Sequence, residues 1–223
     1  MSVIHTEFRE YIAEKEITTK IFISIFYAVG IFGMLVSSLF PLFAKLVPLA
    51  LILSLLTLSV FHSDIKSKKS MLVFLFIYIF SYTIEVVGVN TGLIFGKYQY
   101  GHSLGLKLFD TPIIIGLNWL LLIYLTSSVI ERLSLNTILK IVMSSSLMLV
   151  YDIILEQVAP RLNMWRFNNG DVPLQNYLVW FVTSLILHTV IKVNSIKTEN
   201  KLSLIILVSQ FLFFLILTIF LKQ

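Results

Sequence analysis

The sequence predicts an all-α, polytopic transmembrane helical bundle of about seven spans. Two observations concern composition: hydrophobic residues make up 57% of the 223 residues, and charged residues only 13%. Soluble domains carry about 25% charged residues. The third observation is arrangement, because the apolar residues gather into runs of the length that crosses a bilayer as a helix. Lipid must therefore surround much of this chain.

The apolar runs set the expected spans. A helix needs about 20 apolar residues to cross a hydrocarbon core of about 30 Å. The seven expected spans are Ile21–Phe40, Leu42–Phe61, Met71–Val89, Pro112–Ile130, Ile138–Leu155, Tyr177–Val193 and Leu202–Leu221. The first two should form a hairpin around Pro41, and a re-entrant hairpin would reduce the count to six. We expect a single integral membrane domain over residues 1–223, with residues 1–20 as an N-terminal cytoplasmic lead.

The basic residues predict the orientation. With seven spans, eleven Lys and Arg residues fall on the face that holds the N-terminus, and six fall on the opposite face. Cytoplasmic loops carry the excess of Lys and Arg, so we expect a cytoplasmic N-terminus, in the cytoplasmic membrane of a bacterium. The basic residues lie in short loops and form no tract that could follow a phosphate backbone, so no nucleic-acid partner is expected. The absence of cysteine excludes disulfides and thiol catalysis.

Three carboxyl groups lie within or at the ends of the apolar runs. Glu85 belongs to the third expected span, and Asp152 and Glu156 lie at the end of the fifth. Burying such groups is costly, so each is a functional candidate, although a position in headgroup water at a helix end would explain them too. Asp152 and Glu156 are four residues apart and share a helix face. Two close carboxyl groups in a low dielectric should not both ionise, so one should hold a proton and be able to act as a general acid.

Two loops on the less basic face are unusually rich in Gly, Asn, Arg and aromatic residues. They run from Val89 to Thr111 and from Glu156 to Asn176. Trp and Tyr also form belts at membrane interfaces, but a belt does not require the accompanying amides. Gly88, Gly92 and Gly96 recur at every fourth position, which favours a close helix-packing seam. Gly96 would otherwise mark a turn.

Two blocks of sequence resemble a membrane family of carotenoid biosynthesis proteins that includes carotenoid hydratases. The first runs from Glu85 through Gly88, Asn90 and Gly92 to Tyr100, and continues to Leu104, Gly105, Pro112 and Trp119. The second contains Asp152, Glu156, Pro160, Trp165, Gly170, Pro173, Asn176 and Trp180. The resemblance covers roughly residues 71–190. Glu156 stands where the family pattern would have Asp.

The resemblance implies hydration of a terminal isoprenoid double bond of an acyclic or monocyclic carotenoid. Protonation of the alkene would give a tertiary cation, and water would capture it. Glu85, Asp152 and Glu156 are the candidate catalytic residues. The candidate substrate-binding residues are Tyr98, Tyr100, Trp119, Trp165, Asn176 and Trp180. Aromatic faces would stabilise the cation, and Asn176 would position the water. No cofactor or metal is required, and the expected partners are a carotenoid dissolved in the bilayer and other carotenoid biosynthesis enzymes.

Two alternatives remain at this stage. An isomerase or cyclase acting on isoprenoid lipids would use the same acid and the same kind of cation, but would leave the mass of its substrate unchanged. A non-catalytic carotenoid- or lipid-binding membrane protein would retain pigment without altering it. A transporter is disfavoured, because the expected spans are polar mainly near one face.

Overall fold

The computed structural model describes residue 11 and residues 14–221. Most of the predicted N-terminal lead lies outside the described residues. Eight described helices form the bundle: α2 (Glu16–Leu35), α3 (Phe40–Lys45), α4 (Val47–Phe61), α5 (Lys68–Thr91), α6 (Ile114–Glu131), α7 (Thr137–Val158), α8 (Leu174–Val193) and α9 (Ser203–Phe220). The all-α transmembrane architecture is confirmed: six described helices, α2 and α5–α9, have the length and apolar composition to cross a membrane.

The second expected span is divided into two helices. Helix α3 ends at Lys45, and α4 begins at Val47 with Pro48 in its first turn. A proline is tolerated there because the first backbone N–H groups of a helix have no partner within it. Helix α4 has 15 residues, or about 22 Å at 1.5 Å per residue. It is therefore a shorter apolar helix that supplements the six long ones.

Helix α2 begins five residues earlier than the hydropathy pattern predicts. Glu16 opens the helix, and its side chain pairs with Lys20 at 2.5 Å and with Lys201 at 3.0 Å. These ion pairs join the start of α2 to the loop before α9, the helix that packs along α2. The apolar run alone does not indicate that the helix begins at Glu16 or that Glu16 pairs with Lys201.

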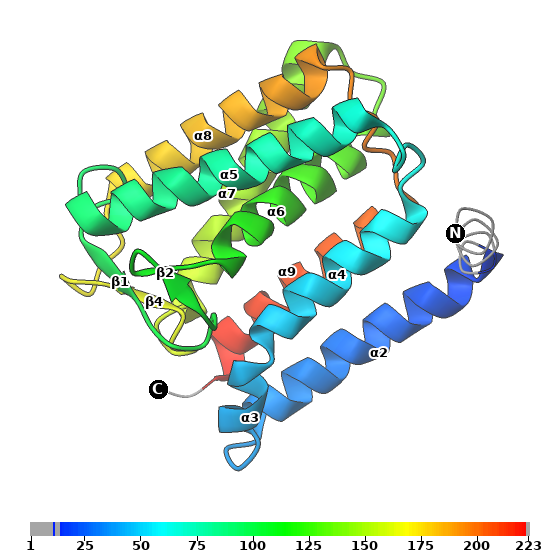
Figure 1. The fold of residues 1–223 in the computed structure, drawn as a ribbon. Helices are drawn as coiled ribbons and strands as arrows, with labels where there is room; N and C mark the ends of the chain where they lie inside the picture. Colours follow the sequence, from blue (N-terminus) through cyan, green and yellow to red (C-terminus); the bar gives the residue numbers. More distant parts are fainter. Residues whose placement is uncertain (1–10, 12–13, 222–223) are drawn as a thin grey trace.

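Helix α6 lies at the centre of the bundle and packs against α4, α5, α7, α8 and α9 (Figure 1). Most of its side chains are buried. At one end of the bundle, Glu131 at the end of α6 pairs with Lys140 at 2.7 Å and also with Lys192. The two unusual loops lie at the other end.

Those two loops form the β-structure. Strand β1 (Tyr98–Tyr100) pairs with β4 (Trp165–Phe167), and β2 (Lys107–Leu108) pairs with β3 (Thr111–Pro112), both in antiparallel fashion. Figure 1 shows β1 and β4 side by side beyond the ends of α5 and α8. The loop between spans three and four and the loop between spans five and six are thereby joined into one ribbon over one end of the bundle.

Candidate active site

The β1–β4 ribbon aims aromatic side chains into the bundle. Its register pairs Tyr98 with Phe167 and Tyr100 with Trp165. Side chains alternate between the two faces of a strand, so these four aromatic residues are buried while the intervening Gln99 and Arg166 are exposed. Each three-residue strand thus contributes two buried aromatic rings, Tyr98 and Tyr100 from β1 and Trp165 and Phe167 from β4.

Glu85 is the acceptor for three buried donors. One carboxyl oxygen accepts hydrogen bonds from the hydroxyls of Tyr98 at 2.6 Å and Tyr100 at 2.7 Å, and the other accepts from the Trp119 indole at 2.8 Å. Burial, reinforced by the neighbouring Glu85 carboxyl, raises the pKa of both tyrosine hydroxyls well above their usual value. The tyrosines therefore remain protonated donors at any physiological pH.

The second carboxyl cluster comprises Asp152, Glu156 and Asn176. The Asn176 amide donates to Asp152 at 3.3 Å and to Glu156 at 3.2 Å, and the Trp165 indole donates to Glu156 at 2.9 Å. All three polar side chains are buried. Oδ1 of Asp152 is buried and has no hydrogen-bond partner among the residues that the structure describes.

Aromatic rings surround the carboxyl groups. Trp119 and Trp180 stack with their centroids 4.0 Å apart, and Tyr100 meets both Tyr98 and Trp165 edge to face, at 5.5 and 6.0 Å. Aromatic faces carry negative potential and attract cations. The walls of this space suit a substrate that becomes positively charged.

A small cavity lies at the centre of these groups. Its volume is about 10 Å³, which is roughly the space that one water molecule needs. Its lining residues are Glu85, Phe95, Tyr98, Tyr100, Ile115, Glu156, Trp165, Phe167, Asn176 and Trp180. Three of these, Phe95, Ile115 and Phe167, are not among the residues predicted from the sequence. The aromatic composition of the loops signals Phe95 and Phe167, whereas Ile115 is indistinguishable from other apolar residues of its span.

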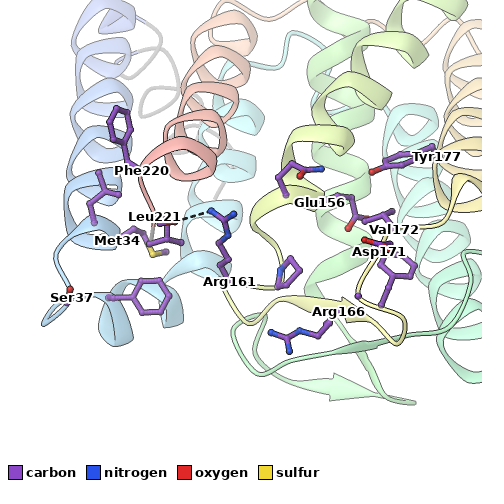
Figure 2. Close-up of a pocket in the computed structure, with 16 residues that line it drawn as sticks. Met34, Ser37, Glu156, Arg161, Arg166, Asp171, Val172, Tyr177, Phe220 and Leu221 are labelled. Carbon is purple, nitrogen blue, oxygen red and sulfur yellow. Dashed lines mark hydrogen bonds between the residues drawn. The ribbon is translucent and has the colours of Figure 1, made fainter. Parts of the chain in front are cut away.

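A much larger groove reaches the same site from the side. It has a volume of about 1280 Å³ and runs between the α2–α3–α9 side of the bundle and the end of α7 with β4 (Figure 2). Its lining is mixed: Met34, Phe40 and Phe220 contribute apolar surface, Arg166 and Asp171 are charged, and Glu156 lies at its inner side. Arg161 reaches across and donates to the Leu221 carbonyl at 3.0 Å. Glu156 and Phe167 line both the groove and the cavity.

The nine predicted site residues lie together, although their roles remain predictions. The glycine seam, by contrast, is wrong: Gly92 ends α5 with a φ of 67°, and Gly96 has a φ of 96° in the turn before β1. Only Gly88 is helical. His188, a buried residue of α8, lies outside the site. Its ring nitrogens are 2.9 Å from the Thr126 hydroxyl and 3.0 Å from the Ser184 hydroxyl.

Comparison with known proteins identifies the family. The family model described as carotenoid biosynthesis protein matches residues 46–223. Bisanhydrobacterioruberin hydratase of Haloarcula japonica is 26% identical over 118 residues, a match that covers 47% of this chain and 39% of that protein. The chain thus matches well under half of this relative's length. No solved structure matches the chain.

The family match includes the nine predicted site residues, every residue that lines the small cavity, and all the long apolar helices after α2. This chain is therefore an integral membrane protein that belongs to the carotenoid biosynthesis protein family.

Proposed function

We propose that this protein hydrates a terminal isoprenoid double bond of an acyclic or monocyclic carotenoid by acid-catalysed addition of water. The observation that carries the proposal is that two buried carboxyl groups, Glu85 and Glu156, line one small, aromatic-walled cavity, and that a third, Asp152, shares the Asn176 amide with Glu156. The relative named as a hydratase supports the same reaction class. An enzyme with a polyene substrate also needs a route from lipid, and we assign that route to the lateral groove.

The proton donor in this proposal is the Asp152–Glu156 pair. Both carboxyl groups are buried and share the Asn176 amide, and two carboxyl groups so placed will not both ionise. Oδ1 of Asp152 is buried and has no hydrogen-bond partner among the described residues. Burying an oxygen without a partner costs less free energy in a neutral carboxylic acid than in a carboxylate, so Asp152 is the favoured site for the proton. Glu156, the member of the pair that lines the cavity, passes this proton to the less substituted alkene carbon, and a tertiary cation forms on its neighbour.

Glu85 has the opposite role. Three donors stabilise its anionic form, because hydrogen bonds to the charged form of an acid favour that form. Its negative charge and the Trp119–Trp180 stack stabilise the cation. As the water oxygen bonds to the cationic carbon, the proton that it releases passes to Glu85. Return of this proton to the acid pair completes a cycle that adds one water and consumes no net proton.

The polyene enters through the groove. The cavity has room for about one water, so an isoprenoid end can reach it only when the side chains between groove and cavity move. Glu156 and Phe167 line both spaces and are the side chains that must give way. With a cytoplasmic N-terminus, the site would lie near the non-cytoplasmic surface, opposite the Glu131 cluster.

Pigment mass provides the test. The chain and its variants are produced in a host that makes an acyclic carotenoid, and the extracted pigments are examined for the mass of one added water. We expect hydration by the parent protein and its loss in Asp152→Asn and Glu85→Gln. Glu131→Gln is the matched control, because it neutralises a carboxyl group at the opposite end of the bundle and should retain hydration. Full hydration by both site variants would contradict the proposed mechanism, and a pigment of unchanged mass but altered structure would favour an isomerase or cyclase.

A further inference from the structure

A second hollow lies on the outer side of the β1 strand. Its volume is about 520 Å³, and it is separate from the lateral groove: no residue lines both. We call it the vestibule. Most of the side chains around it are polar or charged, and its lining residues are Val89, Asn90, Thr91, Gly92, Lys97, Tyr98, Gln99, Tyr100, Lys107, Asp110 and Asn168. Such a lining suits water and does not suit a polyene.

Two residues separate the vestibule from the cavity. Tyr98 and Tyr100 line both spaces, and their hydroxyl groups donate to Glu85. The Lys107 ammonium group lies on the vestibule side, where it donates to the Tyr100 carbonyl at 2.5 Å. The barrier between the outer polar hollow and the carboxylate is therefore one strand thick.

The rim of the vestibule contains a strained turn that helix α5 holds in place. Phe109 and Asp110 join β2 to β3 with φ values of 52° and 59°, a conformation that favours Asn and Gly and is unfavourable for Phe. The Asn90 amide donates to the Phe109 carbonyl at 3.1 Å, and the Tyr82 hydroxyl donates to the Leu108 carbonyl at 2.7 Å. Strain that neighbouring groups hold in this way is found at functional sites. Here it fixes the position of Asp110 at the rim.

We propose that the vestibule supplies the water that captures the cation, through the Tyr98–Tyr100 barrier. The inference rests on the proposed hydration. During turnover the polyene fills the groove, which closes that side to solvent. Water must then arrive from another side, and the vestibule is a polar hollow that shares Tyr98 and Tyr100 with the cavity. The two substrates thus enter separately, the polyene at Glu156 and the water at Glu85.

The fate of the cation reveals whether water arrives. With water present, the oxygen bonds to the cationic carbon and one proton leaves the oxygen. Without it, a neighbouring carbon loses a proton to the acid pair, which has just given up its own, and an alkene forms again. In D₂O the acid delivers a deuteron, so an alkene formed in this second way has the mass of the substrate plus one deuterium in place of a hydrogen. Deuterium in unhydrated polyene therefore measures cations that escaped capture.

The test compares Gln99→Leu, Asn168→Leu and the double variant with the parent protein, purified in detergent with an acyclic carotenoid in D₂O. Both side chains are exposed and line the vestibule. We expect the ratio of hydrated product to deuterium-labelled alkene to fall about tenfold in the double variant, which corresponds to about 1.4 kcal/mol between the two fates. The control is Asn169→Leu, the same change at the next residue, which lines neither hollow and should keep the parent ratio.

Each outcome decides between the claims. A lower ratio in the vestibule variants with the parent ratio in Asn169→Leu supports the water route. An unchanged ratio in all variants, or hydration and labelling that fall together in both single variants, overturns it. A parent protein that neither hydrates nor labels the polyene would instead overturn the proposed function itself.

Discussion

Two successive parts of the chain share one structural plan. In the first, α5 leads through β1 into α6, and in the second, α7 leads through β4 into α8. Each first helix carries a buried glutamate near its end, each strand supplies an aromatic donor to that glutamate, and each second helix supplies one member of the stacked tryptophan pair. The two strands pair antiparallel and so join the two parts.

The difference between the two parts lies in how their carboxyl groups are satisfied. In the first part, both oxygens of Glu85 accept hydrogen bonds from three donors. In the second part, Asp152 and Glu156 share one amide, and Asp152 keeps a buried oxygen without a partner among the described residues. In the proposed mechanism, this difference makes Glu85 the anion and the Asp152–Glu156 pair the carrier of the proton. This division is how acid and base roles are assigned in sites with several carboxyl groups.

The largest expected effect tests this division directly. In D₂O, Asp152→Asn should lose both hydration and alkene labelling by a factor of about 10² or more, because no proton reaches the alkene. Glu85→Gln should lose hydration but retain labelling. In the proposed mechanism Glu85 accepts the proton of the attacking water, and the alkene has already been protonated by then. Mass spectrometry of the recovered polyene measures both. Labelling that disappears in Glu85→Gln and persists in Asp152→Asn would reverse the two roles.

Asn176 should matter more than a comparable amide elsewhere. Asn176→Leu deprives Asp152 and Glu156 of their shared donor, and we expect hydration to fall at least about tenfold, because a buried charged group that loses a partner costs about 1–3 kcal/mol. Gln210→Leu is the counterpart in α9, where the amide donates to the Tyr27 hydroxyl at 2.9 Å. It should lower the melting temperature and leave hydration intact. Equal losses of hydration in both would show that the effect is one of folding.

Gly101 joins the two parts and should not tolerate a side chain. A Cβ at this position would lie 2.1 Å from the Asn163 carbonyl oxygen, so Gly101→Ala must displace β1 from the loop before β4. We expect a loss of about 1–3 kcal/mol in stability from this overpacking, together with reduced hydration. Gly30→Ala is the control, since its Cβ would meet only the flexible Phe213 ring, at 3.3 Å. Thermal unfolding of both variants measures the difference.

The smallest expected effect concerns the tryptophan stack. Trp180→Phe retains an aromatic ring but reduces its overlap with Trp119, a contact worth about 0.5–1.5 kcal/mol. Hydration should slow by about threefold to tenfold while the protein remains folded. An unchanged rate would mean that the stack serves packing and does not stabilise the cation.

The sequence predicts the helices well because lipid imposes one requirement on all of them, a run of apolar residues. It also identifies Glu85 and Asp152, because charge within such a run is costly. It does not reveal the shared plan. The pairing of Tyr98 with Phe167 depends on residues far apart in the chain, and strands of three residues have no periodicity to detect. The turn at Phe109 also escapes prediction, because its conformation opposes the preference of the residue and is imposed by Tyr82 and Asn90.

The order of the hydrogen-bond partners along the chain has a consequence for biosynthesis. Glu85 precedes Tyr98, Tyr100 and Trp119, and Glu156 precedes Trp165 and Asn176, so each glutamate leaves the ribosome before the donors that satisfy it. During insertion the translocon or the lipid headgroups must accommodate each carboxyl group until its own loop and next helix arrive. A polypeptide interrupted between residues 85 and 98 would present an unsatisfied acid to the quality-control proteases of the membrane.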